Sequence, residues 1–104
     1  MLAINVEDSG IVLIVGCSHP TVERIVARAE ALFESPVIGI VGGLHYEGFG
    51  FVDVQPHIEF LSAHNLKLVA LSPHDSSPEA LEAFQSAFTD RYHMLSVGET
   101  IQFP

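Results

Sequence analysis

The stretch GIVLIVGCSHPTVERIV, residues 10–26, decides the fold because a strand pattern and a helix pattern meet inside it. Its first part, Ile11 to Val15, is a continuous apolar run, which is typical of a strand buried on both faces. From Val22 onward, apolar residues recur at spacings of three and four, which predicts an amphipathic helix that ends at the ESP sequence of residues 34–36. A buried strand therefore passes into a helix through a short segment that carries a thiol, a hydroxyl and an imidazole.

The rest of the chain repeats this alternation of strand and helix, which argues for an α/β fold with a mainly parallel sheet. The glycine-rich loop at residues 42–50 is expected to be mobile and exposed. Either Ser76 with Glu79 or Ser77 with Pro78 supplies the start signal of the last helix. Strands are predicted at residues 2–6, 11–15, 37–43, 66–71, 92–97 and 100–103, and helices at about 22–33, at 56–64 and around Leu81, Phe84 and Phe88.

Length and composition limit the classes of protein to which the chain can belong. A single domain, residues 1–104, accounts for the whole length. The formal net charge of −9 would repel the phosphates of nucleic acids and anionic lipid surfaces, so we expect neither as a partner. No apolar run approaches the ~20 residues of a membrane span, and no signal peptide is recognised. The expected location is therefore the cytoplasm, and the single cysteine, which excludes an internal disulfide, is compatible with its reducing conditions.

Chemically reactive side chains follow three of the predicted strands, at the point where each strand ends. His19, His45 and His74 each lie within a few residues of an apolar run. The carboxyl ends of the strands form the ligand-binding edge of parallel sheets, so three imidazoles there indicate metal binding or proton transfer. The alternative, that each histidine is an ordinary polar loop residue, stays open on these residues alone.

The remaining histidines and the cysteine receive structural interpretations. His57 and His64 are seven residues apart on one predicted helix, too far to share a metal ion, and are expected on the solvated surface. His93 is expected to be a strand residue with no chemistry. Cys17 is either a thiolate nucleophile at a helix N-terminus or a small buried side chain, and the second interpretation is simpler because the spacing of a phosphatase-type loop is absent.

The motifs around these residues carry a family resemblance that covers essentially the whole chain. The sequences GIVLIVGCSHPTVERIV, VIGIVGGLH, LVALSPHDSSPEALEAF and DRYHMLSVGETIQF resemble the C-terminal half of metallo-β-lactamase-fold hydrolases, in the branch that includes the dihydropterin ribofuranosyl-aminobenzene phosphate synthases. The resemblance implies half of an αββα sandwich, with one mixed sheet and helices on one face. It implies that His19 and His74 are metal ligands, one on each metal of a two-metal site. His45 and Asp75 are implied as further metal or substrate contacts.

The chain also departs from the family pattern. The main metal-binding motif of the family, H-x-H-x-D-H, belongs to the N-terminal half and occurs nowhere in this sequence, and SPHDSSPEA replaces the usual P-C-H-C-T-G. A hydrolytic site needs about three protein ligands per ion, so we expect only weak binding of zinc or another divalent transition metal, and we assign no catalytic residue.

Two functions fit this pattern. The chain is interpreted as the C-terminal half or subunit of a metal-dependent hydrolase that is inactive alone. The alternative is a non-catalytic interaction or regulatory module that retains the fold.

The apolar strands predict a binding partner. If helices cover one face of the sheet, the strand residues at 11–15, 37–41 and 68–71 would leave apolar surface on the other face, which is not expected of a monomer. We therefore expect either a homodimer that packs sheet on sheet, or a complex with a complementary N-terminal half that carries H-x-H-x-D-H.

Overall fold

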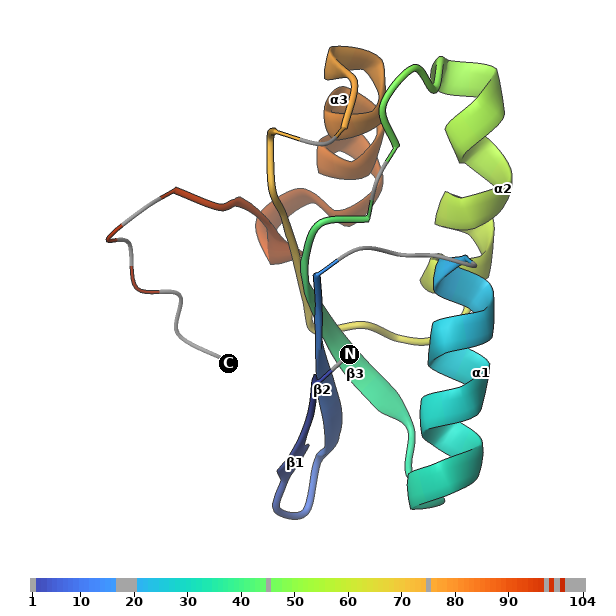
Figure 1. The fold of residues 1–104 in the computed structure, drawn as a ribbon, viewed down its shortest axis with the longest axis vertical. Helices are drawn as coiled ribbons and strands as arrows, with labels where there is room; N and C mark the ends of the chain where they lie inside the picture. Colours follow the sequence, from blue (N-terminus) through green and yellow to red (C-terminus); the bar gives the residue numbers. More distant parts are fainter. Residues whose placement is uncertain are drawn as a thin grey trace.

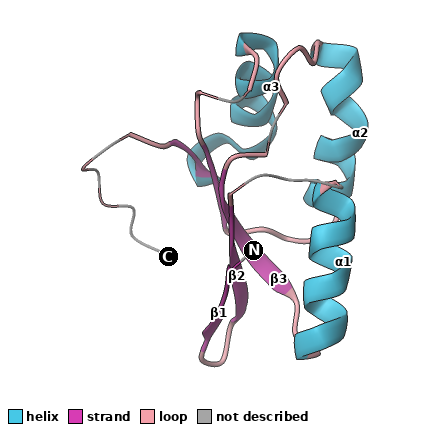
Figure 2. Ribbon diagram, viewed as in Figure 1, coloured by secondary structure: helices cyan, strands magenta, loops and turns pink. Residues whose placement is uncertain are grey.

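The computed structural model contains a single mixed sheet with a layer of helices, and it describes residues 2–16, 21–44, 46–74, 76–96, 98 and 100 (Figures 1 and 2). Its elements in chain order are β1 (Leu2–Val6), β2 (Gly10–Val15), α1 (Val22–Phe33), β3 (Val37–Gly42), α2 (Phe51–Ser62), β4 (Leu68–Leu71), α3 (Pro78–Phe88), the 3₁₀ turn η1 (Thr89–Arg91) and β5 (Tyr92–Met94).

The strands lie in the spatial order β1-β2-β3-β4-β5. β1 and β2 form the predicted antiparallel hairpin, whereas β2, β3, β4 and β5 pair in parallel. All three α-helices lie on the same side of this sheet (Figure 1). The predicted fold class is therefore confirmed: an α/β layer pair with one mixed sheet and helices on one face.

The hydrophobic core lies between the helices and the sheet face that they cover. Leu13 of β2 pairs with Ile40 of β3, and Ile40 pairs with Val69 of β4, so these side chains share one face, and all three are fully buried. The helices complete the core with buried residues at spacings of three and four, which are Val22, Val26 and Ala29 of α1, Val54, Ile58 and Leu61 of α2, and Ala80, Phe84 and Phe88 of α3.

The opposite face of the sheet, here called the second sheet face, is also apolar. Register places Leu2, Ile4, Val12, Ile14, Val41, Leu68 and Ala70 on it. Its exposure is uneven, because Leu2, Ile4 and Ile14 are 59%, 44% and 38% exposed whereas Val12, Leu68 and Ala70 are buried. The expectation that the whole second sheet face is exposed is therefore wrong for β4. In the strands of the predicted interface, every second side chain lies on the other face and belongs to the core.

The largest differences between predicted and observed boundaries concern α2 and β5. Helix α2 begins at Phe51, five residues before the predicted start, and includes Pro56 in its interior. The Asp53 carboxylate accepts a hydrogen bond from the Gly50 N–H at 2.9 Å, which stabilises this early start. Strand β5 ends at Met94, three residues before its predicted end. The last predicted strand, residues 100–103, lies almost entirely outside the described residues.

The membrane prediction can be compared with the helices directly. Across the described ranges, no helix combines the length and the apolar character needed to cross a bilayer.

Gly42 ends β3 because no other residue fits there. Its φ is +132°, and a Cβ atom added to it would lie 1.9 Å from the Val15 carbonyl oxygen of the neighbouring strand. The next residue, Gly43, donates its N–H to that same oxygen at 3.0 Å. The close approach of two strand ends therefore depends on a glycine at position 42.

We expect Gly42→Ala to lower the free energy of unfolding by about 3 kcal/mol or more, because it combines backbone strain with a clash against backbone. Urea denaturation followed by circular dichroism measures the change. The matched control is Gly16→Ala, since a Cβ there would meet nothing within 4 Å. Equal stabilities of the two variants would show that β2 and β3 do not approach this closely.

Candidate functional site

The carboxyl ends of β2, β3 and β4 meet at one edge of the sheet. The three strands are parallel, and their last residues Val15, Gly42 and Leu71 are paired in register. The predicted residues His19, His45, His74 and Asp75 follow these strand ends in the sequence. His19, His45 and Asp75 lie outside the described residues, so the structure places only His74 of this set.

His74 lies on a turn just beyond β4, and its side chain is exposed. Two hydrogen bonds hold the turn: the His74 N–H donates to the Ser72 hydroxyl at 3.3 Å, and the Ser72 N–H donates to the Gly42 carbonyl of β3 at 3.0 Å. A shallow pocket of about 260 Å³ lies beside the imidazole, lined by Ser72, His74, Leu95 and Ser96. The edge therefore presents an accessible imidazole beside hydroxyl groups.

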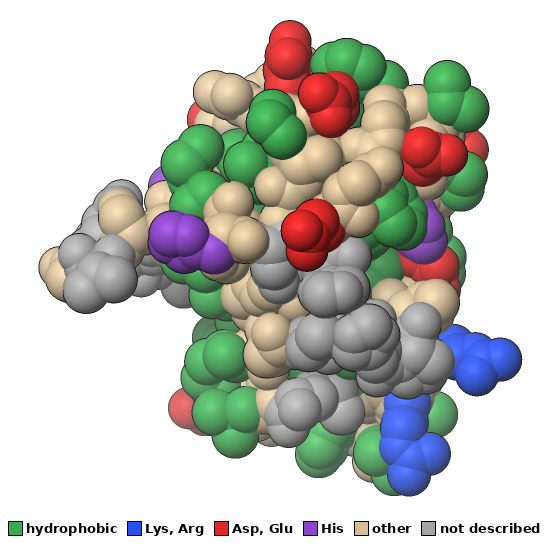
Figure 3. Space-filling view, turned by 45° about the horizontal axis from the view of Figure 1, so that its top comes forward, with side chains coloured by type: hydrophobic (Ala, Val, Ile, Leu, Met, Phe, Trp, Pro, Cys, Tyr) green, Lys and Arg blue, Asp and Glu red, His purple; other side chains and the backbone are tan. Residues whose placement is uncertain are grey.

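The charges near this end of the molecule are mostly negative. Figure 3 brings this end forward and shows carboxylate side chains scattered over it, whereas the Lys and Arg side chains in view lie together at one side. Arg24 and Arg28, both exposed, lie one turn apart on α1. A surface of this kind attracts cations more than anions.

The described residues do not form a complete metal site. No group of three or more His, Cys, Asp or Glu side chains in the described ranges is arranged to hold an ion. A structural or catalytic zinc ion takes at least three protein ligands, so one imidazole at position 74 does not fit that requirement alone.

The loop that follows β3 has two buried hydrophobic side chains, which corrects the sequence-based expectation of an exposed loop. Leu44 and Tyr46 are only 1% and 3% exposed. The Tyr46 ring stacks on Phe84 with 5.5 Å between centroids and lies 5.2 Å from both Phe49 and His57. The glycines of this loop therefore allow the chain to turn while an aromatic side chain anchors it in the core.

The Tyr46 hydroxyl is buried and has no hydrogen-bond partner in the described part of the chain. Burial raises the pKa of this phenol well above its usual value, and the nearby Glu23 carboxylate raises it further. A buried hydroxyl without a partner costs free energy, so the ring and not the hydroxyl accounts for the anchoring.

His57 and His64 are not simply solvated, which corrects their predicted role. Nδ1 of His57 lies 2.6 Å from the Glu23 carboxylate, and Nε2 of His64 lies 3.5 Å from that of Glu30. Both imidazoles are about 20% exposed and face acidic residues of α1, His57 from within α2 and His64 from just beyond its end. The partners of each pair are 34 residues apart, so no local pattern could have revealed them.

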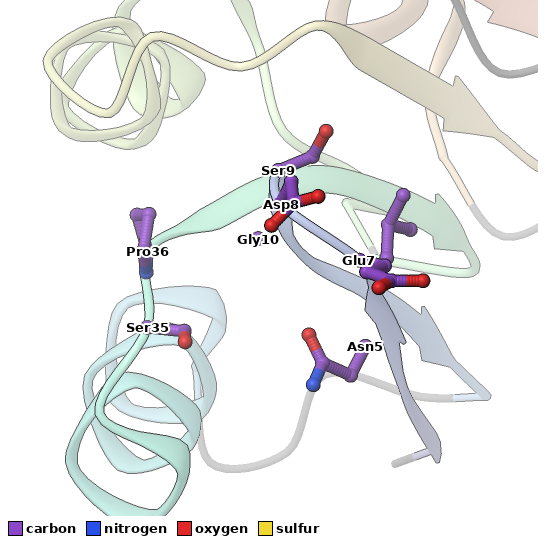
Figure 4. Close-up of a pocket in the computed structure, with 8 residues that line it drawn as sticks. Asn5, Glu7, Asp8, Ser9, Gly10, Ser35 and Pro36 are labelled. Atoms are coloured by element: carbon purple, nitrogen blue, oxygen red, sulfur yellow. The ribbon is translucent and has the colours of Figure 1, made fainter.

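A second pocket lies at the opposite edge of the sheet, around the β1–β2 turn and the start of β3 (Figure 4). It measures about 400 Å³ and is polar, with Asn5, Glu7, Asp8, Ser9 and Ser35 among its lining residues. Figure 4 shows the Glu7 and Asp8 carboxylates apart from each other rather than converging on one point. This pocket therefore lacks the geometry of a cation site and is separate from the edge that carries His74.

Comparisons with known proteins connect this geometry to a known fold. No protein-family model matches the chain, and no curated protein matches it. Among solved structures, the chain is similar to Tm1679, a metal-dependent hydrolase of the beta-lactamase superfamily, with a TM-score of 0.83 and 19% sequence identity. The match covers 96% of this chain but only 38% of Tm1679, so the chain spans well under half the length of that protein.

We expect Tyr46→Phe to raise the free energy of unfolding at neutral pH by about 1 kcal/mol, because it removes a buried hydroxyl without a partner. The pH dependence should change as well. Above pH ~10 the tyrosine of the unfolded chain loses its proton while the buried one keeps it, so stability falls as pH rises, and the variant should fall less steeply. Denaturation between pH 7 and 11 measures both effects.

Tyr92→Phe is the comparison variant, since the Tyr92 hydroxyl is also buried without a described partner and burial raises its pKa. A loss of stability in Tyr46→Phe would show that the Tyr46 hydroxyl makes a bond that the described residues do not supply.

Proposed function

We propose that this chain, which has the fold of one part of a metal-dependent hydrolase of the beta-lactamase superfamily, is the C-terminal half or subunit of such a hydrolase. One observation carries the proposal: a chain with this fold has three parallel strands that end at one edge, and histidines follow all three in the sequence. In this proposal the edge is one side of a metal site whose other side belongs to a second polypeptide.

His19 and His74 are the proposed metal ligands, one for each of two ions, and His45 and Asp75 are proposed as further metal or substrate contacts. Neutral imidazole suits zinc and other divalent transition metals. Two or three such ligands do not complete two ions, because a zinc ion takes about three protein ligands. The proposal therefore assigns weak metal binding, and no hydrolysis, to the chain alone.

The second sheet face is the proposed contact with the other half. Its exposed part consists of Leu2, Ile4 and Ile14, which lie side by side because Leu2 pairs with Ile14. Strands β1 and β2, which carry these residues, contain no charged side chain, whereas carboxylates occur on all three helices. Sheet-on-sheet packing therefore brings together neutral apolar surfaces and keeps the acidic helices apart, whether the partner is a second copy or a complementary N-terminal half.

A non-catalytic interaction or regulatory module is the second candidate function. It is favoured by the absence of the H-x-H-x-D-H motif from this sequence, because a chain that had lost metal chemistry could keep the same fold. The proposed location in either case is the cytoplasm, since a single cysteine suits a reducing compartment.

We expect His74→Ala and His19→Ala each to weaken zinc binding about tenfold or more, because each removes one imidazole from an already incomplete set of ligands. Isothermal titration calorimetry with zinc chloride on the purified chain measures the affinity. His93→Ala is the matched control, since His93 is half-buried in β5 and lies on the second sheet face. Wild-type affinity in both single variants would remove His19 and His74 from the proposed site.

We expect the isolated chain to be a dimer at micromolar concentration, and Ile4→Lys or Ile14→Lys to weaken dimerisation about tenfold or more by placing a charge in an apolar interface. Light scattering measures the mass in solution. Leu32→Lys is the control, because Leu32 is 58% exposed but lies on α1, away from this face. A wild-type monomer that binds no hydrophobic dye, or equal effects of all three variants, would contradict the proposed interface.

A further inference from the structure

The two loops at the carboxyl edge are joined by three serines that follow β4. The loop after β3 contains Tyr46 and Phe49, and the segment between β4 and α3 contains Ser72, Ser76 and Ser77, here called the serine clasp. Ser76 and Ser77 are 9% and 8% exposed and are the buried polar residues of the described part. Buried hydroxyls are retained where they make hydrogen bonds, so the partners of these two indicate their purpose.

Each serine of the clasp bonds across to β3 or to the loop that follows it. The Ser72 N–H donates to the Gly42 carbonyl at 3.0 Å, and the Ser77 N–H donates to the Tyr46 carbonyl at 3.2 Å. The Ser76 hydroxyl accepts from the Tyr46 N–H at 3.4 Å, and the Ser77 hydroxyl donates to the Phe49 carbonyl. Four hydrogen bonds thus connect segments that are about 30 residues apart in the chain.

Ser77 also fixes where α3 begins. Its hydroxyl oxygen accepts a hydrogen bond from the Ala80 N–H at 3.1 Å, and Pro78 occupies the first helical position. The same hydroxyl therefore caps the helix and holds the loop after β3. A helix that starts on this atom cannot shift without moving the loop.

His74 lies between the two ends of the clasp. On one side, the Ser72 hydroxyl accepts a 3.3 Å hydrogen bond from the backbone N–H of His74. On the other side, Ser76 follows His74 by two positions in the sequence. The imidazole itself is exposed and makes no contribution to the core. Its placement relative to the loop after β3 therefore depends on the serine bonds.

We propose that Ser76 and Ser77 are positioning residues, which hold the turn of His74 against the loop after β3 at the carboxyl edge of the sheet. The inference rests on the proposed function only in treating His74 as a ligand. A ligand on an exposed turn is useful only if its backbone is fixed, and a buried hydroxyl bonded across two loops fixes it without occupying the site.

The test is amide hydrogen exchange, followed by NMR on the metal-free protein. We expect Ser76→Ala to raise the exchange rate of the Tyr46 amide at least tenfold relative to amides of β3 and β4, and to shift the ring-proton resonances of His74. Ser76→Thr, which keeps the hydroxyl, should restore both. Wild-type exchange at Tyr46 together with unchanged His74 resonances in Ser76→Ala would overturn the inference.

Glu30→Ala is the control for a general loss of stability. The Glu30 carboxylate accepts from the Val37 N–H at 3.0 Å at the start of β3 and lies 3.5 Å from Nε2 of His64, so the variant loses at least as much at the other edge as Ser76→Ala loses at the carboxyl edge. It should leave the Tyr46 amide and the His74 resonances unchanged, and changes equal to those of Ser76→Ala would overturn the inference. A wild-type chain that binds no zinc would overturn the proposed function instead, because the exchange experiment needs no metal.

Discussion

Every crossover between the parallel strands passes over the same face of the sheet. The order β2-β3-β4-β5 advances in one direction, and right-handed crossovers then place every connecting helix on one side. This constraint produces the other main features of the molecule. It concentrates the core under α1, α2 and α3, brings the carboxyl ends of the strands to a common edge, and leaves the second sheet face without helices in the described part of the chain (Figure 1).

The strands were predictable because their signal is local. The apolar runs of β2, β3 and β4 are buried on the helix-covered face, and the hairpin of β1 with β2 follows from the turn between them. The loop after β3 was not predictable, because glycines suggest mobility whereas the packing of Tyr46 on Phe84 depends on a residue far away in the chain. The early start of α2 was missed because Pro56 suggests a boundary.

The candidate site was predictable only in outline. Parallel strands end at one edge, so His74 could be assigned to that edge from the sequence, and the structure places it there. The role of the serines could not be read in the same way. Ser77 with Pro78 correctly indicates the start of α3, but bonds from Ser76 and Ser77 to residues 28 to 30 positions away leave no periodic signal. Sequence patterns report contacts within an element better than contacts between loops.

The outer strand β1 has a consequence for how the chain behaves in concentrated solution. It lies at the end of the sheet and contains neither a charged residue nor a proline, the usual devices that keep edge strands from pairing with other molecules. At neutral pH the net charge of −9 opposes such pairing by repulsion at a distance. Acidification neutralises carboxylates and removes that repulsion, so the colloidal stability of the chain depends on charges outside β1 rather than on the strand that is at risk.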